Sequence, residues 1–235
     1  MLKAMIASCR RPTLSRPEFF HYMANVHAPM ATSLPAIAAN ILHATQNRTM
    51  LPEDNVDIAT LYRHDKTRDS VVELCFDNLT RMMNIMEDEG YLSTIRPDEE
   101  NFNDLTRALL VFLDEEEQFS STSEELTHKT FDYVRRRRDM TPEEFQVQWA
   151  DYGRSLASND AYRALAKKRI HNIPTEGHPT AIMPPQDFDG VAATFFDSFA
   201  DADALVRQGL ADGEKKLVDI GECLSIVVVG GRIRM

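Results

Sequence analysis

The chain has 235 residues, of which 43% are hydrophobic, enough for one large domain or for two domains of about 100–120 residues. Its 26 Lys and Arg residues against 37 Asp and Glu residues give a formal charge of −11, which disfavours nucleic acid and anionic membranes as partners. No apolar run reaches the roughly 18 residues that a membrane-spanning helix needs, and the first residues lack a signal-peptide pattern. We therefore expect a cytoplasmic protein.

An internal repeat is the strongest organising feature of the sequence. Residues 14–19, Leu-Ser-Arg-Pro-Glu-Phe, are matched 126 positions later by residues 140–145, Met-Thr-Pro-Glu-Glu-Phe. Both segments are capping boxes, in which Ser or Thr caps the helix and a Glu three residues later reaches back to it. Residues 69–77 and 189–197 form a second matching pair, each typical of a strand that runs into a helix.

In chain order the two halves predict the same elements. The first half gives a strand over 2–9, a helix from 15, an extended segment around His43, a strand over 70–76, a helix over 79–89 and a strand over 108–113. The second half gives the corresponding elements at 130–135, from 141, around His171, and at 190–196, 200–211 and 224–229. Such a sheet has one bare apolar face, so two units stabilise each other by packing face to face. We predict an α+β fold made of two ferredoxin-like βαββαβ repeats that pack sheet to sheet as an α+β barrel.

The boundary between the repeats is expected in the acidic, serine-rich stretch 114–125, which reads as a solvated connection. We divide the chain into domains 1–121 and 122–235. The first carries His27, whereas the matching position of the second is Gly153.

His27 is the leading catalytic candidate. Apolar residues recur along its helix at three- and four-residue steps, which places His27 on the stripe that faces the sheet. Pro29 removes a helical hydrogen bond and should end or kink the helix there. An imidazole can both accept and donate a proton near neutral pH, so His27 suits acid/base chemistry. The alternative is a buried histidine paired with a carbonyl or carboxylate group.

Glu73 is the second catalytic candidate. Strand alternation places it on the face opposite Val72 and Leu74, pointing into the barrel, where an apolar environment should raise its pKa. The alternative is an edge residue paired with an arginine. Further polar side chains of the first helix and the second strand are expected to bind the substrate through hydrogen bonds: Tyr22, His43, Gln46, Asn47 and Arg48. His64 is expected to bind it at the mouth of the cavity.

Neither metal-ligand spacing nor a glycine-rich nucleotide motif occurs in the sequence, so we expect no metal and no cofactor. The three cysteines have no metal-type spacing and are expected to be reduced core residues.

The stretch 10–31, with Val-His-Ala-Pro at 26–29, resembles the helix signature of the EthD family, and segments 71–77 and 111–119 are similar to the corresponding strands. The resemblance implies a fold of the dimeric α+β barrel superfamily and an enzyme, or its relative, that acts on aromatic, lactone or polyketide-like molecules in a barrel cavity. It also implies an acid/base role for the histidine of this stretch, which is His27.

The leading hypothesis is a cofactor-independent lyase or isomerase that binds a small aromatic or conjugated molecule. A monooxygenase or haem-associated barrel protein is one alternative, and a non-catalytic ligand-binding protein is another. The exposed sheet edges of such a unit also leave a homodimer possible.

Overall fold

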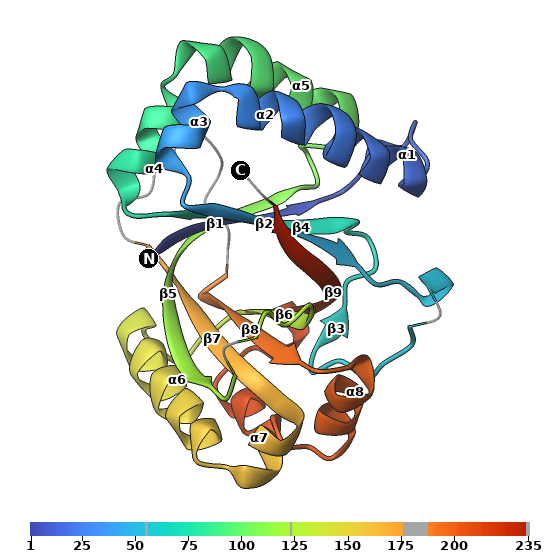
Figure 1. Ribbon diagram of the computed structural model, residues 1–235. Coiled ribbons are helices and arrows are strands. Elements are labelled where there is room, and N and C mark those ends of the chain that lie inside the picture. The colour runs from blue at the N-terminus through green and yellow to red at the C-terminus, as the bar shows by residue number, and fades with distance from the viewer. Residues whose placement is uncertain (55, 123, 176–187, 234–235) are drawn as a thin grey trace.

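A computed structural model describes residues 1–54, 56–122, 124–175 and 188–233 as two βαββαβ units (Figure 1). The first unit consists of β1 (Leu2–Ser8), α1 (Arg16–Tyr22), η1 (Met23–His27), α2 (Ala28–Ser33), α3 (Pro35–Asn40), β2 (His43–Thr49), η2 (Pro52–Asp54), β3 (Arg63–His64), β4 (Ser70–Phe76), α4 (Leu79–Met86), η3 (Tyr91–Ile95), α5 (Arg96–Phe102) and β5 (Leu109–Ser120). The second unit consists of β6 (His128–Val134), α6 (Pro142–Ala157), α7 (Asp160–Leu165), β7 (Ala166–Pro174), β8 (Gly190–Phe196), α8 (Phe199–Arg207), η4 (Asp212–Lys216), η5 (Ile220–Glu222) and β9 (Leu224–Ile233).

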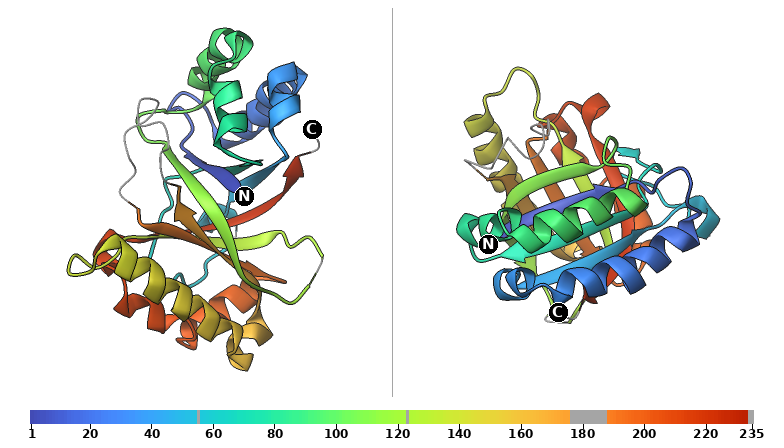
Figure 2. Two further views of the ribbon diagram at one scale, coloured as in Figure 1. Left: turned by 90° about the vertical axis from the view of Figure 1, so that its left-hand side faces the viewer. Right: turned by 90° about the horizontal axis from the view of Figure 1, so that it is seen from above.

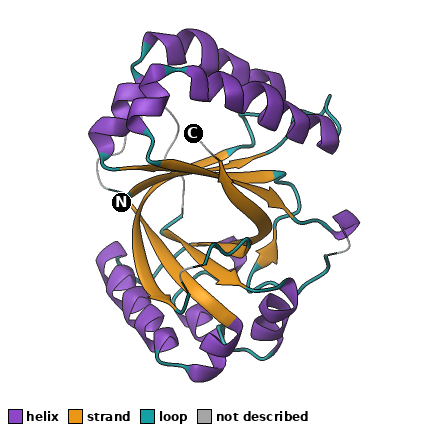
Figure 3. Cartoon of the chain, in the orientation of Figure 1, coloured by secondary structure: helices purple, strands orange, loops and turns teal. Residues whose placement is uncertain are grey.

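The strands close into an eight-stranded antiparallel barrel in the order β2-β4-β1-β5-β7-β8-β6-β9, and β9 pairs back with β2. The last strand of each unit thus pairs with the second strand of the other, through β5–β7 and β9–β2. The short β3 adds to β9 in parallel. Helices of the first unit cover one side of the barrel and those of the second unit cover the other (Figures 2 and 3). The predicted fold class is confirmed.

Both predicted capping boxes are formed. The Ser15 side chain accepts from the backbone N–H of Glu18, whose carboxylate accepts from the backbone N–H of Ser15, and Thr141 and Glu144 repeat the arrangement. These bonds satisfy N–H groups that the first turn of a helix leaves without partners. Each long helical segment therefore starts where the sequence predicts.

The stretch expected to be a solvated connection is instead part of a strand. β5 continues to Ser120 and pairs with β7 after it has left β1. Its acidic residues are tolerated there because basic neighbours compensate them: Glu115 lies 2.7 Å from Lys3, and Glu117 lies 2.7 Å from Lys168. β6 begins at His128, and the division at 121/122 remains a prediction.

Alternation along the strands gives the barrel an inner and an outer face. Side chains on the inner face, such as Met5, Val71, Val111, Phe131 and Ile226, form one closely packed buried cluster. The outer face of the first unit's sheet meets α2, α3, α4 and η3, and Val72 on the same face packs in a cluster with Phe102 of α5. A substrate cavity was expected inside the barrel, but among the described residues side chains from both units pack together there.

Candidate functional site

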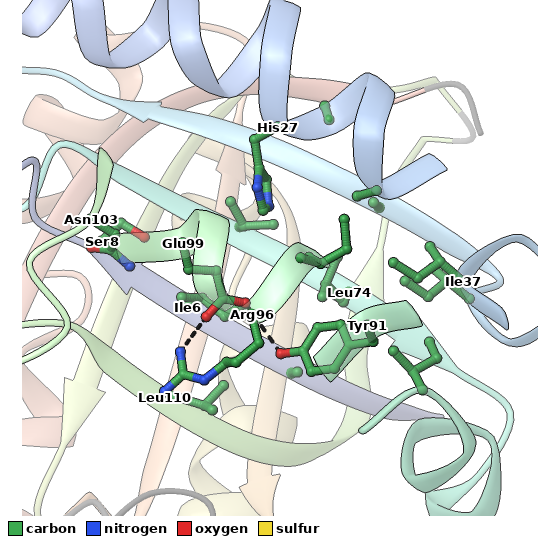
Figure 4. Close-up of a pocket in the computed structure, with 18 of the residues that line it drawn as sticks. Ile6, Ser8, His27, Ile37, Leu74, Tyr91, Arg96, Glu99, Asn103 and Leu110 are labelled. Atoms are coloured by element: carbon green, nitrogen blue, oxygen red, sulfur yellow. Dashed lines mark hydrogen bonds and ion pairs between the residues drawn. The ribbon is translucent and has the colours of Figure 1, made fainter. Parts of the chain in front are cut away.

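A cavity of about 410 Å³ lies between the outer face of the first unit's sheet and the helices that cover it (Figure 4). This volume is within the range of small-molecule sites. Most of its lining is aliphatic or aromatic, contributed by strands β1, β2, β4 and β5 and by the helices, and includes Ile6, Leu74, Ile85, Phe102 and Leu110. A small number of polar side chains interrupt this surface, and they are where chemistry is to be sought.

His27 reaches this cavity from the end of a π-helical turn. The backbone N–H of Ala28 donates to the carbonyl of Met23, five residues back, and Pro29 follows as the second residue of α2. Because proline has no N–H, the regular α-helical bond cannot form at that position, and the extra residue of the π turn accommodates the change. The helical segment therefore continues to Ser33, and His27 lines the cavity between the helices and the sheet.

Asp98 on α5 holds the His27 ring. The Nδ1 atom of His27 lies 2.9 Å from Oδ2 of Asp98, and the phenol of Tyr22 donates to Oδ1 at 2.5 Å. The amide of Asn101 also donates to Oδ1, at 3.1 Å. Burial by itself would raise the pKa of Asp98, but the hydrogen bonds from Tyr22, His27 and Asn101 bring it below its ordinary value. An ionised Asp98 can accept a hydrogen bond from Nδ1–H, an arrangement that leaves Nε2 of an uncharged imidazole free to accept a proton.

Phe102 completes the support of the ring, with its centroid 4.7 Å from that of His27. The His27 side chain is 19% exposed and that of Asp98 is 7% exposed. The pair is therefore partly shielded from water, while the ring still contacts the cavity.

A second polar group lines the cavity on the side of η3 and α5 (Figure 4). The Glu99 carboxylate accepts from the Tyr91 phenol at 3.2 Å and from the Arg96 guanidinium. Burial and the Glu99 charge raise the pKa of Tyr91, so the phenol remains a neutral donor.

Two of the predicted substrate-binding residues lie in or beside this site. Gln46 lines the cavity, and its amide lies 3.6 Å from the Met23 sulfur. Tyr22 contacts Asp98 rather than the cavity and so belongs to the support of His27.

Glu73 is placed elsewhere, and the prediction of a raised pKa is wrong. Its side chain lies in the barrel interior, where Lys3 is at 2.8 Å, Lys129 at 3.1 Å and the Asn47 amide at 3.0 Å. Burial alone would raise the pKa of Glu73, but the two lysine charges and the hydrogen bonds lower it well below its ordinary value. The sequence indicates the correct face of β4 but not these lysines, so Glu73 is a buried ion-pair partner outside the cavity.

The other candidates are not brought to the cavity. Asn47 points into the barrel and donates to the Val71 carbonyl at 2.9 Å, and Arg48 forms an ion pair with Asp54 at 2.8 Å. His43 pairs with Cys75 in the sheet, and His64 lies in β3 against β9. Burial and the Lys66 charge lower the pKa of His64. None of these four predicted residues is among the described side chains that line the cavity.

The site residues that sequence reasoning missed lie on η3 and α5. Tyr91, Arg96, Asp98 and Glu99 all belong to this stretch, which was left without a predicted element. A signal was available, because Pro97 followed by Asp98 and Glu99 is typical of the first turn of a helix. The contact with His27 has no such local signal.

The corresponding face of the second unit can be identified from the strand register. Gln46 pairs with Val72 in the first unit, and His171 pairs with Ala192, which stands 120 positions later, in the second. His171 is therefore the counterpart of Gln46 rather than of His43, although both histidines lie in the corresponding strands as predicted.

Large side chains fill this face of the second unit. Trp149 stacks on His171 with ring centroids 3.9 Å apart, and its indole N–H donates to Glu214 at 2.8 Å. Arg169 forms a fully buried ion pair with Glu214 at 2.6 Å. Gly153 leaves room for them, because a Cβ atom there would lie 2.8 Å from Cε1 of His171. A pocket of about 20 Å³ beside Asp132 and Arg169 holds at most about one water molecule.

Comparison with known proteins identifies the family. The EthD domain profile matches residues 11–106 and 137–220. The chain belongs to the EthD family. A protein named dehydratase ustZ, from Ustilaginoidea virens, is 26% identical to this EthD chain over 110 residues, which are 45% of the chain and 77% of that protein.

Solved structures share the fold of this EthD protein at low identity. An anthrone oxidase-like protein aligns with a TM-score of 0.63 and 9% identity, over 98% of this chain and 92% of that one. A putative monooxygenase from Lactobacillus acidophilus aligns with a TM-score of 0.54 and 10% identity, over 100% and 98% of the two chains. A mutant chlorite dismutase from Candidatus Nitrospira defluvii aligns with a TM-score of 0.54 and 10% identity, over 97% and 91%. These likenesses concern the fold alone.

The described residues contain neither a membrane-spanning helix nor a cluster of metal-ligand side chains. No helix among them is long and apolar enough to cross a bilayer. Within the same ranges, no three His, Cys, Asp or Glu side chains are grouped so that they could hold a metal ion.

Proposed function

We propose that this EthD protein is a lyase of the dehydratase type that removes water from a largely apolar, aromatic or polyketide-like molecule bound in the first unit's cavity. The observation that carries the proposal is His27, an imidazole at the wall of an apolar cavity whose Nδ1 atom is anchored on Asp98. Among the proton transfers open to such a group, the name of the dehydratase relative favours elimination.

The chemistry needs one group that takes a proton and then returns it. Nε2 of neutral His27 removes a proton from the carbon next to a substrate carbonyl, and the electron pair of that C–H bond becomes the new C=C bond. The C–O bond to the hydroxyl on the adjacent carbon breaks, and the departing oxygen takes the proton from the imidazolium and leaves as water. Asp98 stabilises the imidazolium between these events, because its charge lies next to Nδ1.

A bicyclic β-hydroxy ketone provides the test. 3-Hydroxy-1-tetralone has apolar rings like those the cavity should accept, and loss of water gives the fluorescent product 1-naphthol after tautomerisation. We expect His27→Ala to lower kcat for it, or for a tricyclic analogue, by at least about 100-fold. The matched control is His21→Ala, because His21 lies on the same helix segment but is exposed.

Two results would count against the proposal. Undiminished turnover by a folded His27→Ala protein would exclude His27 as the proton-transfer group. Turnover that stops when O₂ is removed would indicate oxygen chemistry instead of elimination.

A further inference from the structure

Glu99 is the acidic side chain of the cavity wall. Among the described residues that line the cavity it is the sole Asp or Glu, and Arg96 is the sole Lys or Arg. Glu99 extends from α5, and His27 extends from η1 on the neighbouring helix segment (Figure 4). His27 and Glu99 are thus two separate polar groups in a mostly apolar cavity wall.

Two neighbours fix the Glu99 carboxylate against the wall. Tyr91 donates to Oε1 at 3.2 Å, and the Arg96 guanidinium donates to Oε2. Tyr91 and Arg96 also line the cavity, so these contacts hold the carboxylate at its surface. The Glu99 side chain is 23% exposed, compared with 40% for Arg96.

The fixed carboxylate retains capacity to accept hydrogen bonds. Its two oxygens offer about four lone-pair positions, and Tyr91 and Arg96 occupy two of them. A hydroxyl group from a ligand can donate to a remaining position. Such a bond to a charged acceptor is stronger than one between neutral groups, and the apolar surroundings strengthen it further.

We propose that Glu99 is a recognition site for a hydroxyl group that the substrate keeps. This inference rests on the proposed dehydration at His27. A departing hydroxyl must gain a proton, and a carboxylate that accepts its hydrogen bond opposes that step, so the hydroxyl at Glu99 is not the one that leaves. The substrate class is a neutral molecule with apolar rings, a leaving hydroxyl that lies at His27, and a retained phenol or alcohol that lies at Glu99.

The test compares the binding of 2-naphthol and 2-methoxynaphthalene, which share the ring system but differ in the hydrogen-bond donor. Titration calorimetry should give at least about a tenfold preference for 2-naphthol in the wild-type protein. Glu99→Leu should abolish the preference, and the isosteric Glu99→Gln should reduce it severalfold while keeping the shape of the wall. The matched control is Glu100→Leu, because Glu100 is the exposed neighbour on the same helix, and it should keep the full preference.

The outcomes separate this inference from the proposed function. His27→Ala should keep the preference for 2-naphthol, so a loss of dehydration with intact discrimination concerns His27 alone. The inference is overturned if the wild-type protein shows no preference, or if the preference survives in Glu99→Leu. It is also overturned if 2-naphthoate binds more tightly than 2-naphthol, because Arg96 would then be the recognition group.

Discussion

Replacement of Asp98 by Asn tests the central contact of the proposed site. The amide keeps the size of the carboxylate but removes its charge, and its NH₂ group can donate to Nδ1, which would shift the ring proton of His27 to Nε2. His27 and Asp98 are 2.9 Å apart with side chains 19% and 7% exposed, so water replaces the contact poorly. A hydrogen bond to a charged group contributes about 1.5–3 kcal/mol, which corresponds to a fall in kcat of about 10- to 150-fold.

Two measurements on the Asp98→Asn protein check this expectation. Steady-state dehydration gives the change in kcat, and ¹⁵N NMR of the imidazole reports whether Nδ1 or Nε2 carries the proton. Asn101→Ala is the matched control, because it removes a neutral donor to Asp98 at 3.1 Å and leaves the His27 contact in place. Wild-type turnover by folded Asp98→Asn, with the tautomer unchanged, would refute the role given to the carboxylate.

Three further predictions concern the backbone and the second unit. Pro29→Ala supplies the missing N–H, so the π turn can close as α-helix and rotate His27 by about 100°. We expect kcat to fall more than tenfold while the melting temperature stays the same or rises, and full activity would contradict this. Gly153→Ala places a Cβ 2.8 Å from Cε1 of His171 and should lower the free energy of unfolding by about 1–3 kcal/mol in urea titrations, whereas unchanged stability would mean that the face adapts freely. Burial, assisted by the charge of Glu214, raises the pKa of Asp132 from 3.8 to about 7. The contribution of protonated Asp132 to the free energy of unfolding is therefore fully present below about pH 4 and is lost as the pH rises to about 7. Asp132→Asn should remove this loss, so its free energy of unfolding relative to the wild-type protein should be up to about 4 kcal/mol more favourable at pH 8 than at pH 4. An equal difference from the wild-type protein at the two pH values would contradict the assignment.

The fold could be predicted because its signals are local and occur twice. Capping boxes at Ser15 and Thr141 mark where helices begin, and strand alternation along β4 assigns Glu73 to the correct face. The end of β5 could not be predicted in the same way. Its acidic residues resemble a solvated connection until Lys3 and Lys168 are known to lie across the strand pairs.

The site was only half visible in the sequence because its two halves are distant along the chain. The periodicity around His27 and the presence of Pro29 are local features, but Asp98 stands 71 positions later. The same limitation explains Glu73, whose lysine partners Lys3 and Lys129 are 70 and 56 positions away. Face and periodicity can be read locally, whereas the partner that determines a pKa depends on the closed barrel.

The second unit provides an internal control for the cavity. The two units have the same strand order, and β8 pairs with β6 and β7 in the same register as β4 pairs with β1 and β2. In the second unit, however, Trp149, His171 and Arg169 fill the face that lies open in the first unit. The fold by itself therefore does not generate a cavity at this position, because the same arrangement closes it elsewhere in the chain. Smaller side chains at matching positions leave the first cavity open, such as Ala44 in place of Arg169. An open apolar cavity lacks the van der Waals contacts that the filled face of the second unit makes, so it lowers stability. The presence of such a cavity beside His27 therefore favours a role in binding over a role in stability.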